Sequence, residues 1–426
     1  MKHRFAPVAI AAVLALGLAA CAPQTAPPTG GSTAEGNITF WTGSSGTSLE
    51  ILKETIADFE ADHDGVTVEL VELADADLKQ KVQAGLVSGD LPDVFQWYGG
   101  TFMGPLVEAG VVHPLNDYFA EAGDWQDGLN DSWADNFTFD GKTYGVPLDS
   151  SIVTLYYNTE LLAQAGLEGA PESWEEMLDY AEKLKAAGIQ PFTVDGQDGY
   201  PLQQWFTYLA MRIGGVDLIH DAVAGDVEWT DPAFVEAAEQ LEGLIKAGGF
   251  QPGFLGEGYV PNQTNFTEGR AAMMVFGSWM LGAFEPEFRE KVGVAPFPTV
   301  DGGVGEATEL QGGPNATLAI SEKSSNKDLA WELITRITSL ETATERAVRG
   351  LSFVPNRVEV TEAETNPQYY ALVETIQGAT GWNLFWNEVL VPEDNTEFTN
   401  LLNSMAAGQI TGEQMMQQFA EYMASR

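Results

Sequence analysis

Three strand-like stretches open the folded part of this chain: Ile38-Thr39-Phe40-Trp41, Val66-Thr67-Val68-Glu69-Leu70 and Asp93-Val94-Phe95-Gln96-Trp97. Each is rich in β-branched and aromatic residues, which favour strands. The segments between them carry apolar residues at helical spacing, and a capping box at residues 47–50 predicts where the first helix begins. The order strand–helix–strand–helix–strand predicts a parallel α/β sheet with right-handed crossovers.

The rest of the 426-residue chain continues in the same α/β style. The sequence predicts further strands at 154–158, 271–276 and 292–295, and helices that begin at Ser173, at Asp231, near Asn326 and at Gly412. A chain of this length is natural for two domains. We therefore expect two α/β lobes between which the chain crosses, with candidate crossings at 144–151, 301–313 and 353–360. The corresponding domain prediction is 37–148 plus 309–357 for lobe 1, and 149–308 plus 358–426 for lobe 2.

The composition is strongly acidic, with 62 Asp and Glu against 20 Lys and Arg and a formal charge of −42. Such a surface repels nucleic-acid phosphates and anionic lipids, so neither is an expected partner. The four histidines are far apart and show no metal-ligand spacing. One cysteine cannot form an internal disulfide. We expect no cofactor and no resident metal.

The N-terminus predicts export. Residues 1–20 have two basic residues followed by an apolar run, as in a secretory signal, and Cys21 follows Leu18-Ala19-Ala20. This pattern resembles the lipobox of bacterial lipoproteins, which implies cleavage before Cys21, lipidation of its sulfur and attachment to the outer face of the cytoplasmic membrane. The alternative is an ordinary signal peptide with a chance cysteine. Residues 22–36 carry no large apolar side chain, which predicts a flexible tether behind the cysteine.

A series of further segments makes the pattern specific. In chain order they are Leu91-Pro92-Asp93-Val94-Phe95-Gln96-Trp97, Gly141-Lys142-Thr143-Tyr144-Gly145-Val146-Pro147-Leu148-Asp149, Leu155-Tyr156-Tyr157-Asn158, Phe266-Thr267-Glu268-Gly269-Arg270-Ala271-Ala272-Met273, Gly277-Ser278-Trp279 and Asn326-Lys327-Asp328-Leu329-Ala330-Trp331-Glu332. Together with residues 38–41, their order resembles the extracellular solute-binding proteins of ABC sugar importers, the maltose-binding-protein-like class.

That resemblance implies a two-lobed periplasmic-binding-protein fold with three interlobe crossings. It also implies a function: a saccharide binds in the cleft between the lobes, the lobes close, and the closed form is delivered to an ABC permease. Such a receptor is no enzyme, and we expect a monomer.

A sugar site needs flat aromatic platforms and hydrogen-bonding partners. The resemblance implies platforms at Trp97 and Trp279, and a C-terminal platform at Trp386, with Trp382 as its alternative. Trp41 and Trp205 are further candidates, because one ends the first strand and the other falls in the segment that lines the cleft in the family. For each tryptophan the alternative is a position in the core.

The candidate polar contacts lie at strand ends and at the predicted crossings. Asp149 can accept hydrogen bonds from sugar hydroxyls, or serve as a hinge carboxylate. The other candidates, each with a turn or packing role as its alternative, are Ser44, Ser45, Gly99, Gly100, Gln204, Gly312 and Gly313. The segments around Trp41, Trp97, Asp149, Trp279 and Gly312 contain no Lys or Arg, and Arg357 at the third crossing is the nearby exception. These observations favour a neutral mono- or oligosaccharide.

Two other classes of protein fit parts of the sequence. A secreted glycoside hydrolase needs two carboxylates across a cleft, and a chain with this many acids always offers a pair. A surface adhesin also suits a lipid tether. The order of the segments fits a binding protein better than either, since no catalytic motif is complete.

Overall fold

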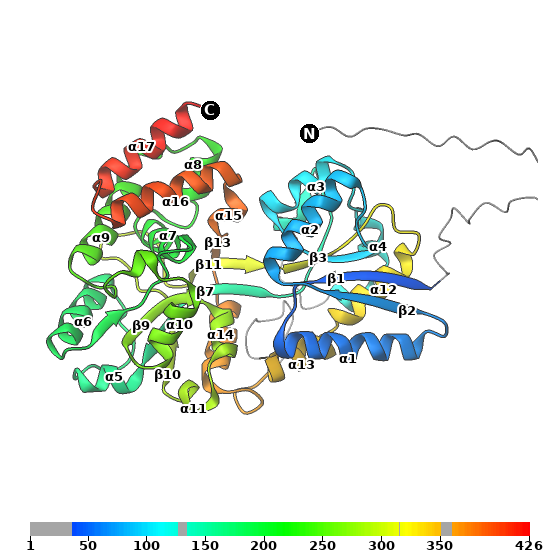
Figure 1. The fold of residues 1–426 in the computed structure, drawn as a ribbon, viewed down its shortest axis with the longest axis horizontal. Coiled ribbons are helices and arrows are strands. Elements are labelled where there is room, and N and C mark those ends of the chain that lie inside the picture. The colour runs from blue at the N-terminus through cyan, green and yellow to red at the C-terminus, as the bar shows by residue number, and fades with distance from the viewer. Residues whose placement is uncertain (1–35, 127–133, 315, 351–359) are drawn as a thin grey trace, which may run out of the picture. The chain divides into compact units, whose positions relative to one another are not determined.

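The computed structural model describes residues 36–126, 134–314, 316–350 and 360–426 (Figure 1). The predicted signal peptide, Cys21 and tether lie outside these residues. Residues Gly36–Arg426 form one compact unit that contains two large sheets. We call the five-stranded sheet and its helices lobe 1, and the six-stranded sheet and its helices lobe 2.

Lobe 1 is built on a five-stranded sheet with the order β2-β1-β3-β12-β6. Its strands are β1 (Asn37–Thr42), β2 (Thr67–Glu72), β3 (Val94–Tyr98), β6 (Val146–Pro147) and β12 (Ala316–Ile320). Strand β1 pairs in parallel with β2 and with β3, as the strand–helix alternation predicts. The fold class inferred from the sequence is therefore confirmed here.

Helices cover both faces of this sheet. They are α1 (Gly46–Asp62), α2 (Asp75–Ser88), α3 (Gly104–Glu108), α4 (Asn116–Glu121), α12 (Lys327–Ile337) and α13 (Leu340–Glu345). One face packs Phe40 against α1 and α12, and the other packs Phe95 and Trp97 against α2 and α3. The predicted capping box at 47–50 is wrong, because α1 begins at Gly46 and its N-cap is Ser45, whose side chain makes no capping bond. A small hairpin of β4 (Thr138–Phe139) and β5 (Lys142–Thr143) completes the lobe.

Lobe 2 is built on a six-stranded sheet with the order β13-β11-β7-β9-β8, in which β10 also pairs with β7. The strands are β7 (Ser150–Asn158), β8 (Gln190–Phe192), β9 (Ala271–Gly277), β10 (Val292–Ala295), β11 (Glu309–Pro314) and β13 (Gly381–Asn383). Strands β7 and β11 extend from this sheet toward the strands of lobe 1 (Figure 1). Two apolar clusters fill the lobe, and the larger contains most of α7.

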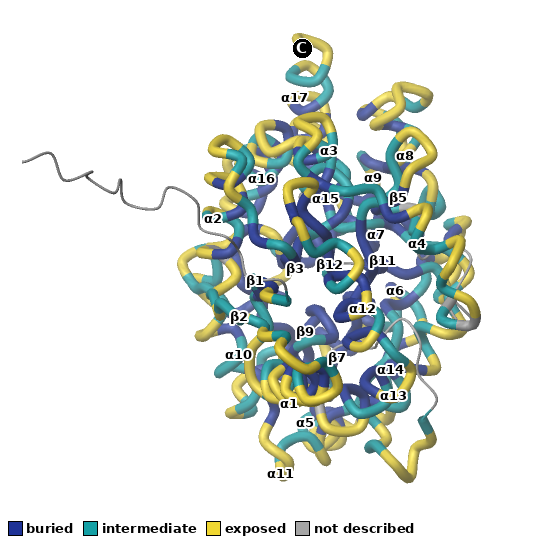
Figure 2. The backbone as a smooth tube through the Cα atoms, turned by 90° about the vertical axis from the view of Figure 1, so that its right-hand side faces the viewer, coloured by how far each residue is buried: buried dark blue, intermediate teal, exposed yellow. Residues whose placement is uncertain are grey.

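The helices of lobe 2 are α5 (Thr159–Gln164), α6 (Trp174–Ala186), α7 (Tyr200–Gly214), α8 (Leu218–Ala224), α9 (Pro232–Lys246), α10 (Tyr259–Thr267), α11 (Pro286–Arg289), α14 (Pro367–Gln377), α15 (Trp386–Val389), α16 (Pro392–Ala406) and α17 (Gly412–Ala424). Ser173 and Asp231 cap α6 and α9 through their side chains, as predicted. Strands β3, β7 and β9 run through buried positions, whereas α1, α5 and α11 carry exposed residues (Figure 2).

The chain changes sheets close to two of the predicted crossings. Strand β6 belongs to lobe 1 and β7 to lobe 2, so the chain passes between them at Leu148–Asp149. The second change falls between Pro314 and Ala316, because β11 pairs with β7 and β13. The predicted start of the lobe 1 return at residue 309 is therefore too early. The predicted third crossing at 353–360 lies almost wholly outside the described residues.

No helix of the described part of the chain is both long enough and apolar enough to cross a membrane.

Candidate ligand-binding site

Asp149 lies where the chain first passes between the sheets, and its side chain is 3% exposed. Its Oδ2 accepts a hydrogen bond from Arg346 Nη2 at 2.8 Å, and Arg346 Nη1 donates to the carbonyl of Leu148 at 3.0 Å. Its Oδ1 has no protein partner among the described residues. Burial raises the pKa of Asp149, and the charge and hydrogen bond of Arg346 oppose that rise. Asp149 is therefore buried at a change of sheet, with one carboxylate oxygen paired to Arg346 and the other left as an acceptor within the described residues.

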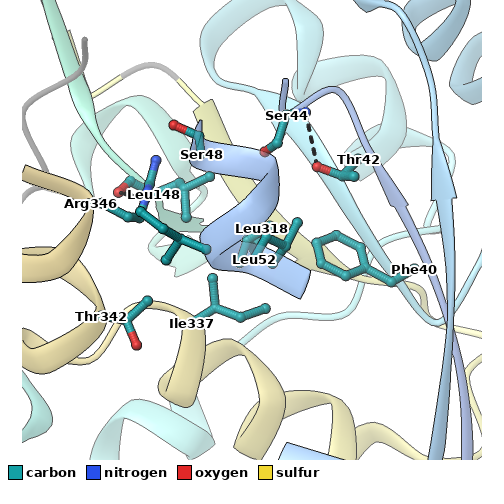
Figure 3. Close-up of a pocket in the computed structure, with 11 residues that line it drawn as sticks. Phe40, Thr42, Ser44, Ser48, Leu52, Leu148, Leu318, Ile337, Thr342 and Arg346 are labelled. Atoms are coloured by element: carbon teal, nitrogen blue, oxygen red, sulfur yellow. Dashed lines mark hydrogen bonds between the residues drawn. The ribbon is translucent and has the colours of Figure 1, made fainter. Parts of the chain in front are cut away.

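Ser44 and Arg346 also line a small cavity beneath the first turn of α1 (Figure 3). Ser44 donates from its backbone N–H to Thr42 Oγ1 at 3.1 Å and from its hydroxyl to Gln96 Oε1 at 3.3 Å. The cavity measures about 10 Å³, room for about one water molecule. Ser45 is exposed at the start of α1. This cavity is too small for a saccharide, so it holds no ligand site of its own.

The end of β3 presents Tyr98 rather than Trp97. Trp97 is 2% exposed, packs in the core and donates its indole N–H to the carbonyl of Phe102 at 2.9 Å. Tyr98 is partly buried, donates its hydroxyl to Asp75 and lies under Lys79, whose Nζ is 4.6 Å from the ring centroid. A ring enclosed by the core has no free face for a sugar, so the geometry favours Tyr98 over Trp97 as a platform.

Gly99 and Gly100 bring lobe 1 against lobe 2. A Cβ at Gly99 would lie 2.4 Å from Asn136 Nδ2, and a Cβ at Gly100 would lie 2.4 Å from the carbonyl oxygen of Glu388 in α15. Gly100 also has a φ of 54°, which favours glycine. The sequence predicts that another group comes close to the backbone at these glycines, and this is observed. The groups that come close are protein groups, Asn136 of lobe 1 and Glu388 of lobe 2.

Trp205 and Trp386 are core residues of lobe 2. Trp205 is fully buried and meets Phe192, Phe250 and Phe297 edge-to-face. Trp386 is 2% exposed, stacks on Phe398 with centroids 4.1 Å apart and donates its indole N–H to Thr207. Both rings are enclosed by aromatic neighbours, so the expectation of stacking platforms at these two positions is corrected.

Trp41, Trp279 and Trp382 keep partly exposed rings. Trp279 follows β9, lies across Gly277 and meets Phe385 with ring centroids 6.1 Å apart. Trp382 lies 3.9 Å from the position that a Cβ of Gly313 would take. The structure therefore favours Trp382, the predicted alternative, over Trp386.

Gly312 and Gly313 end the last strand of lobe 2 before the second change of sheet. A Cβ at Gly312 would lie 2.0 Å from the carbonyl oxygen of Ser151, because β11 packs tightly on β7. Both residues have positive φ, 135° and 144°. Their placement is explained by strand packing at the crossing.

Gln204 is 2% exposed in α7, and neither its amide nitrogen nor its amide oxygen has a protein partner among the described residues. Gln311 Oε1 and Asn383 Oδ1, on the paired strands β11 and β13, are also buried without a partner. Such groups are unfavourable unless water or a ligand pairs with them. Sequence reasoning found Gln204 but missed Gln311, although Gln311 directly precedes the Gly312-Gly313 pair.

Cations do lie beside the candidate segments, contrary to the expectation from the local sequence. Helix α2 places Lys81 Nζ 4.4 Å from the Trp41 ring centroid and Lys79 over Tyr98, and the π-helical turn Arg346–Gly350 supplies Arg346 to Asp149. These residues are distant in sequence from the strands that they meet. Arg357 lies outside the described residues.

Glu388 is a buried acid that the sequence did not single out. Its Oε2 accepts a hydrogen bond from Asn136 Nδ2 at 3.4 Å, and the same Asn136 nitrogen donates to the carbonyl of Pro314 at 3.3 Å. Burial raises the pKa of Glu388 to about 8, while Asn136 and the charge of Lys79 act against the rise. This carboxyl group therefore joins residues of both lobes.

Asp195 and Asp198 form an acidic pair in the segment just before α7. Asp195 is fully buried, accepts a hydrogen bond from the backbone N–H of Asp198 at 2.9 Å and has a pKa raised to about 7, chiefly by burial. No group of three or more metal-ligating side chains occurs within the described ranges. The pair alone is not a metal site.

A comparison with models of protein families shows to which family the chain belongs. The model of the bacterial extracellular solute-binding protein family matches residues 43–343. The chain belongs to this family. The matched segment includes the end of β3, Asp149 and the part of lobe 2 up to Pro314.

Curated relatives extend this picture. Three binding proteins of Brucella abortus and Brucella suis are 26% identical to this chain over 278 residues. The matched region covers 65% of this chain and 65% of each relative. The lactose-binding protein of Rhizobium radiobacter is 26% identical over 395 residues, covering 87% of this chain and 86% of the relative. The galactooligosaccharide-binding protein of Bacillus subtilis is 24% identical over 428 residues, covering 97% and 94%.

Solved structures share the fold over about nine-tenths of this chain. One comes from a study of xylan utilization by the thermophilic bacterium Caldanaerobius polysaccharolyticus, with a TM-score of 0.82, 28% identity and coverage of 91% of this chain and 99% of that one. A chitin oligosaccharide binding protein gives a TM-score of 0.81 at 26% identity, covering 91% and 98%. This solute-binding protein thus has the two-lobed architecture of the family.

Proposed function

We propose that this solute-binding protein is the saccharide receptor of an ABC importer, binding its ligand between the lobes and passing it to the permease after closure. The observation that carries the proposal is a combination of aromatic rings and buried polar groups that both lobes supply. The partly exposed tryptophans and tyrosine are Trp41, Tyr98, Trp279 and Trp382, and the polar groups are Asp149 and Gln204, which have side-chain atoms without a partner among the described residues. Apolar faces and hydroxyls of a sugar require both kinds of group.

The ligand is proposed to be a neutral mono- or oligosaccharide. The cations that the described residues place beside these groups are already engaged: Lys79 pairs with Asp75 at 2.8 Å, Arg346 pairs with Asp149 at 2.8 Å, and Lys81 lies over the Trp41 ring. An anionic sugar needs a cation that is free to pair with it. Relatives named for lactose, for galactooligosaccharides and for chitin oligosaccharides support this class.

A thermal-shift panel of lactose, galactooligosaccharides, xylooligosaccharides and chitooligosaccharides tests the proposal. A ligand at about 100 times its Kd stabilises the folded state by about 2.7 kcal/mol. Trp279→Ala should weaken binding several-fold, because a stacked aromatic contributes about 0.5–1.5 kcal/mol beyond area burial. A panel without any stabilising sugar would contradict the receptor function.

Analysis of the bound sugar for cleavage completes this test. We propose a receptor that leaves its ligand intact, and recovery of unchanged sugar after long incubation is the expected result. Release of shorter products would favour the glycoside hydrolase instead.

The extracellular family accords with the export signal expected at residues 1–20. We further propose that the sulfur of Cys21 is lipidated and that residues 22–36 tether the folded body to the outer face of the membrane. Intact-mass analysis of the protein from its native membrane should show added acyl mass that Cys21→Ala abolishes. A free thiol in the wild-type protein would contradict the anchor.

A further inference from the structure

Glu388 belongs to lobe 2 but is buried against lobe 1. It lies in the four-residue helix α15, which packs against the 3₁₀ turn Gly100–Phe102 of lobe 1. Its backbone carbonyl meets Gly100, and its carboxyl group meets Asn136, whose amide also lies against Gly99. Two glycines therefore leave the space that this interlobe contact occupies.

The surroundings of Glu388 do not favour a charged carboxylate. The group is 4% exposed, and the Asn136 amide donates to it over a long distance of 3.4 Å. Lys79 of α2, whose charge reaches Glu388, is ion-paired with Asp75, which also accepts the hydroxyl of Tyr98. Among the described residues Glu388 has no ion-pair partner, and a buried carboxyl group in such surroundings is more stable when it carries its proton.

On the remaining neighbouring elements, the buried acids Asp149 and Asp394 are paired with arginines, whereas Glu393 and Glu397 of α16 are more exposed and, being acidic, cannot neutralise Glu388. The charges of Asp149 and Glu388 both act on the hydroxyl of Tyr98, so both acids lie near that hydroxyl. Asp149 forms an ion pair with Arg346. On α16, which packs against α15, Asp394 is paired with Arg426 and accepts the hydroxyl of Tyr422. None of these pairs is arranged to neutralise an ionised Glu388.

We propose that the contact of Glu388 with Gly99, Gly100 and Asn136 is a proton-dependent latch, which holds the lobes together while the carboxyl group is protonated. The latch rests on the proposed receptor function, since the joined and separated lobes are its closed and open states. When the lobes separate, water reaches the carboxyl group and it ionises in the ordinary range of glutamate, near ~4.3. Closing therefore takes up one proton from solvent.

The direction of the pH effect follows from this proton uptake. The pKa of Glu388 is about 8 in the joined state, above its value in water. Closure is then most favourable in acid, weakens as the pH rises from ~4.3 toward about 8, and changes no further above that value. Saccharide affinity should fall by up to about tenfold for each pH unit within this window.

The first experiment needs no saccharide. Small-angle scattering of the unliganded protein between pH 5.5 and 9.0 should show a radius of gyration that increases as the pH rises. Glu388→Gln keeps the uncharged shape at every pH, so its radius should stay at the acid value. Glu393→Gln, at an exposed glutamate on α16, is the matched control and should behave like the wild type.

A second variant disrupts the contact by a steric clash. Gly100→Ala places a methyl group against the Glu388 carbonyl, so the lobes should stay apart and the radius should no longer respond to pH. Gly110→Ala is its control, because Gly110 has a similar positive φ of 64° but open space around it. Circular dichroism of all four variants checks that each is folded.

The outcomes distinguish the latch from the receptor function. A radius of gyration that is independent of pH in the wild type, or an unchanged pH response in Glu388→Gln, overturns the latch even if sugars bind. Calorimetry with lactose and xylotriose at pH 6.0 and 8.5 then tests the receptor separately. A pH-dependent radius without any sugar binding would retain the latch and contradict the proposed function.

Discussion

Asp149 and Glu388 are both buried carboxyl groups between the lobes, but they are accommodated in different ways. Asp149 has the guanidinium of Arg346 at 2.8 Å, whereas Glu388 has the neutral amide of Asn136 at 3.4 Å. Asp149 lies in the covalent connection between β6 of lobe 1 and β7 of lobe 2, whereas Glu388 lies on a non-covalent contact that we propose to separate when the lobes part. The comparison indicates two ways to stabilise a buried carboxyl group. Where the lobes are permanently connected, an arginine neutralises the charge of the carboxylate; at a contact that opens and closes, we propose that protonation removes that charge.

Removing Arg346 should make Asp149 resemble Glu388. We expect Arg346→Leu to lower the free energy of unfolding at pH 8 by about 3–5 kcal/mol, because it leaves a buried charge without a partner. The pKa of Asp149 should rise further, so the loss should be smaller at pH 5, where the group takes up a proton. Urea denaturation at the two pH values measures both effects.

Arg336→Leu is the matched control, since its pair with Asp62 is exposed and should contribute at most about 1 kcal/mol. A loss for Arg346→Leu that is as small as that of the control would remove the distinction between the two acids. So would a loss that does not depend on pH.

Asn136→Ala should weaken the Glu388 contact without adding charge. It removes the donor to Glu388 and to the Pro314 carbonyl, and leaving such groups unpaired costs about 1–3 kcal/mol. Since Asn136 lowers the pKa of Glu388, Glu388 should stay protonated to a higher pH in this variant. Urea denaturation and the pH response of the scattering radius measure these two effects, and unchanged values of both would contradict the contact.

The smallest expected effect concerns Lys79. Its charge lowers the pKa of Glu388, so Lys79→Met should move the midpoint of the pH response upward, by less than about one pH unit. The same scattering titration measures this midpoint. A downward shift would show that Lys79 acts on the lobes by another route.

The fold was largely predictable because strand and helix periodicity is local. Residues 38–97 form the predicted parallel arrangement, and Asp149 lies at the predicted crossing. The residue-level site was less predictable, since burial is a property of the tertiary structure. Trp205 and Trp279 look alike in sequence, yet Trp205 is fully buried among aromatic rings, whereas Trp279 is partly exposed.

The missed groups show the same limit. Lys81 and Arg346 reach Trp41 and Asp149 from elements far away in the chain, so a search for cations near each candidate could not find them. Glu388 follows a tryptophan that drew attention to stacking, while the relevant chemistry is the burial of its carboxyl group two residues later.

Scattering with a saccharide tests the central claim most directly. A sugar chosen by the thermal-shift panel should reduce the radius of gyration at pH 9.0, where the proposed latch is open, and be recovered intact, whereas a sugar that gives no thermal shift should leave the radius unchanged. A ligand shifts the balance of open and closed states only through its differential affinity, so compaction requires contacts from both lobes. Tight binding without compaction, or cleavage of the sugar, would contradict a receptor that works by lobe closure.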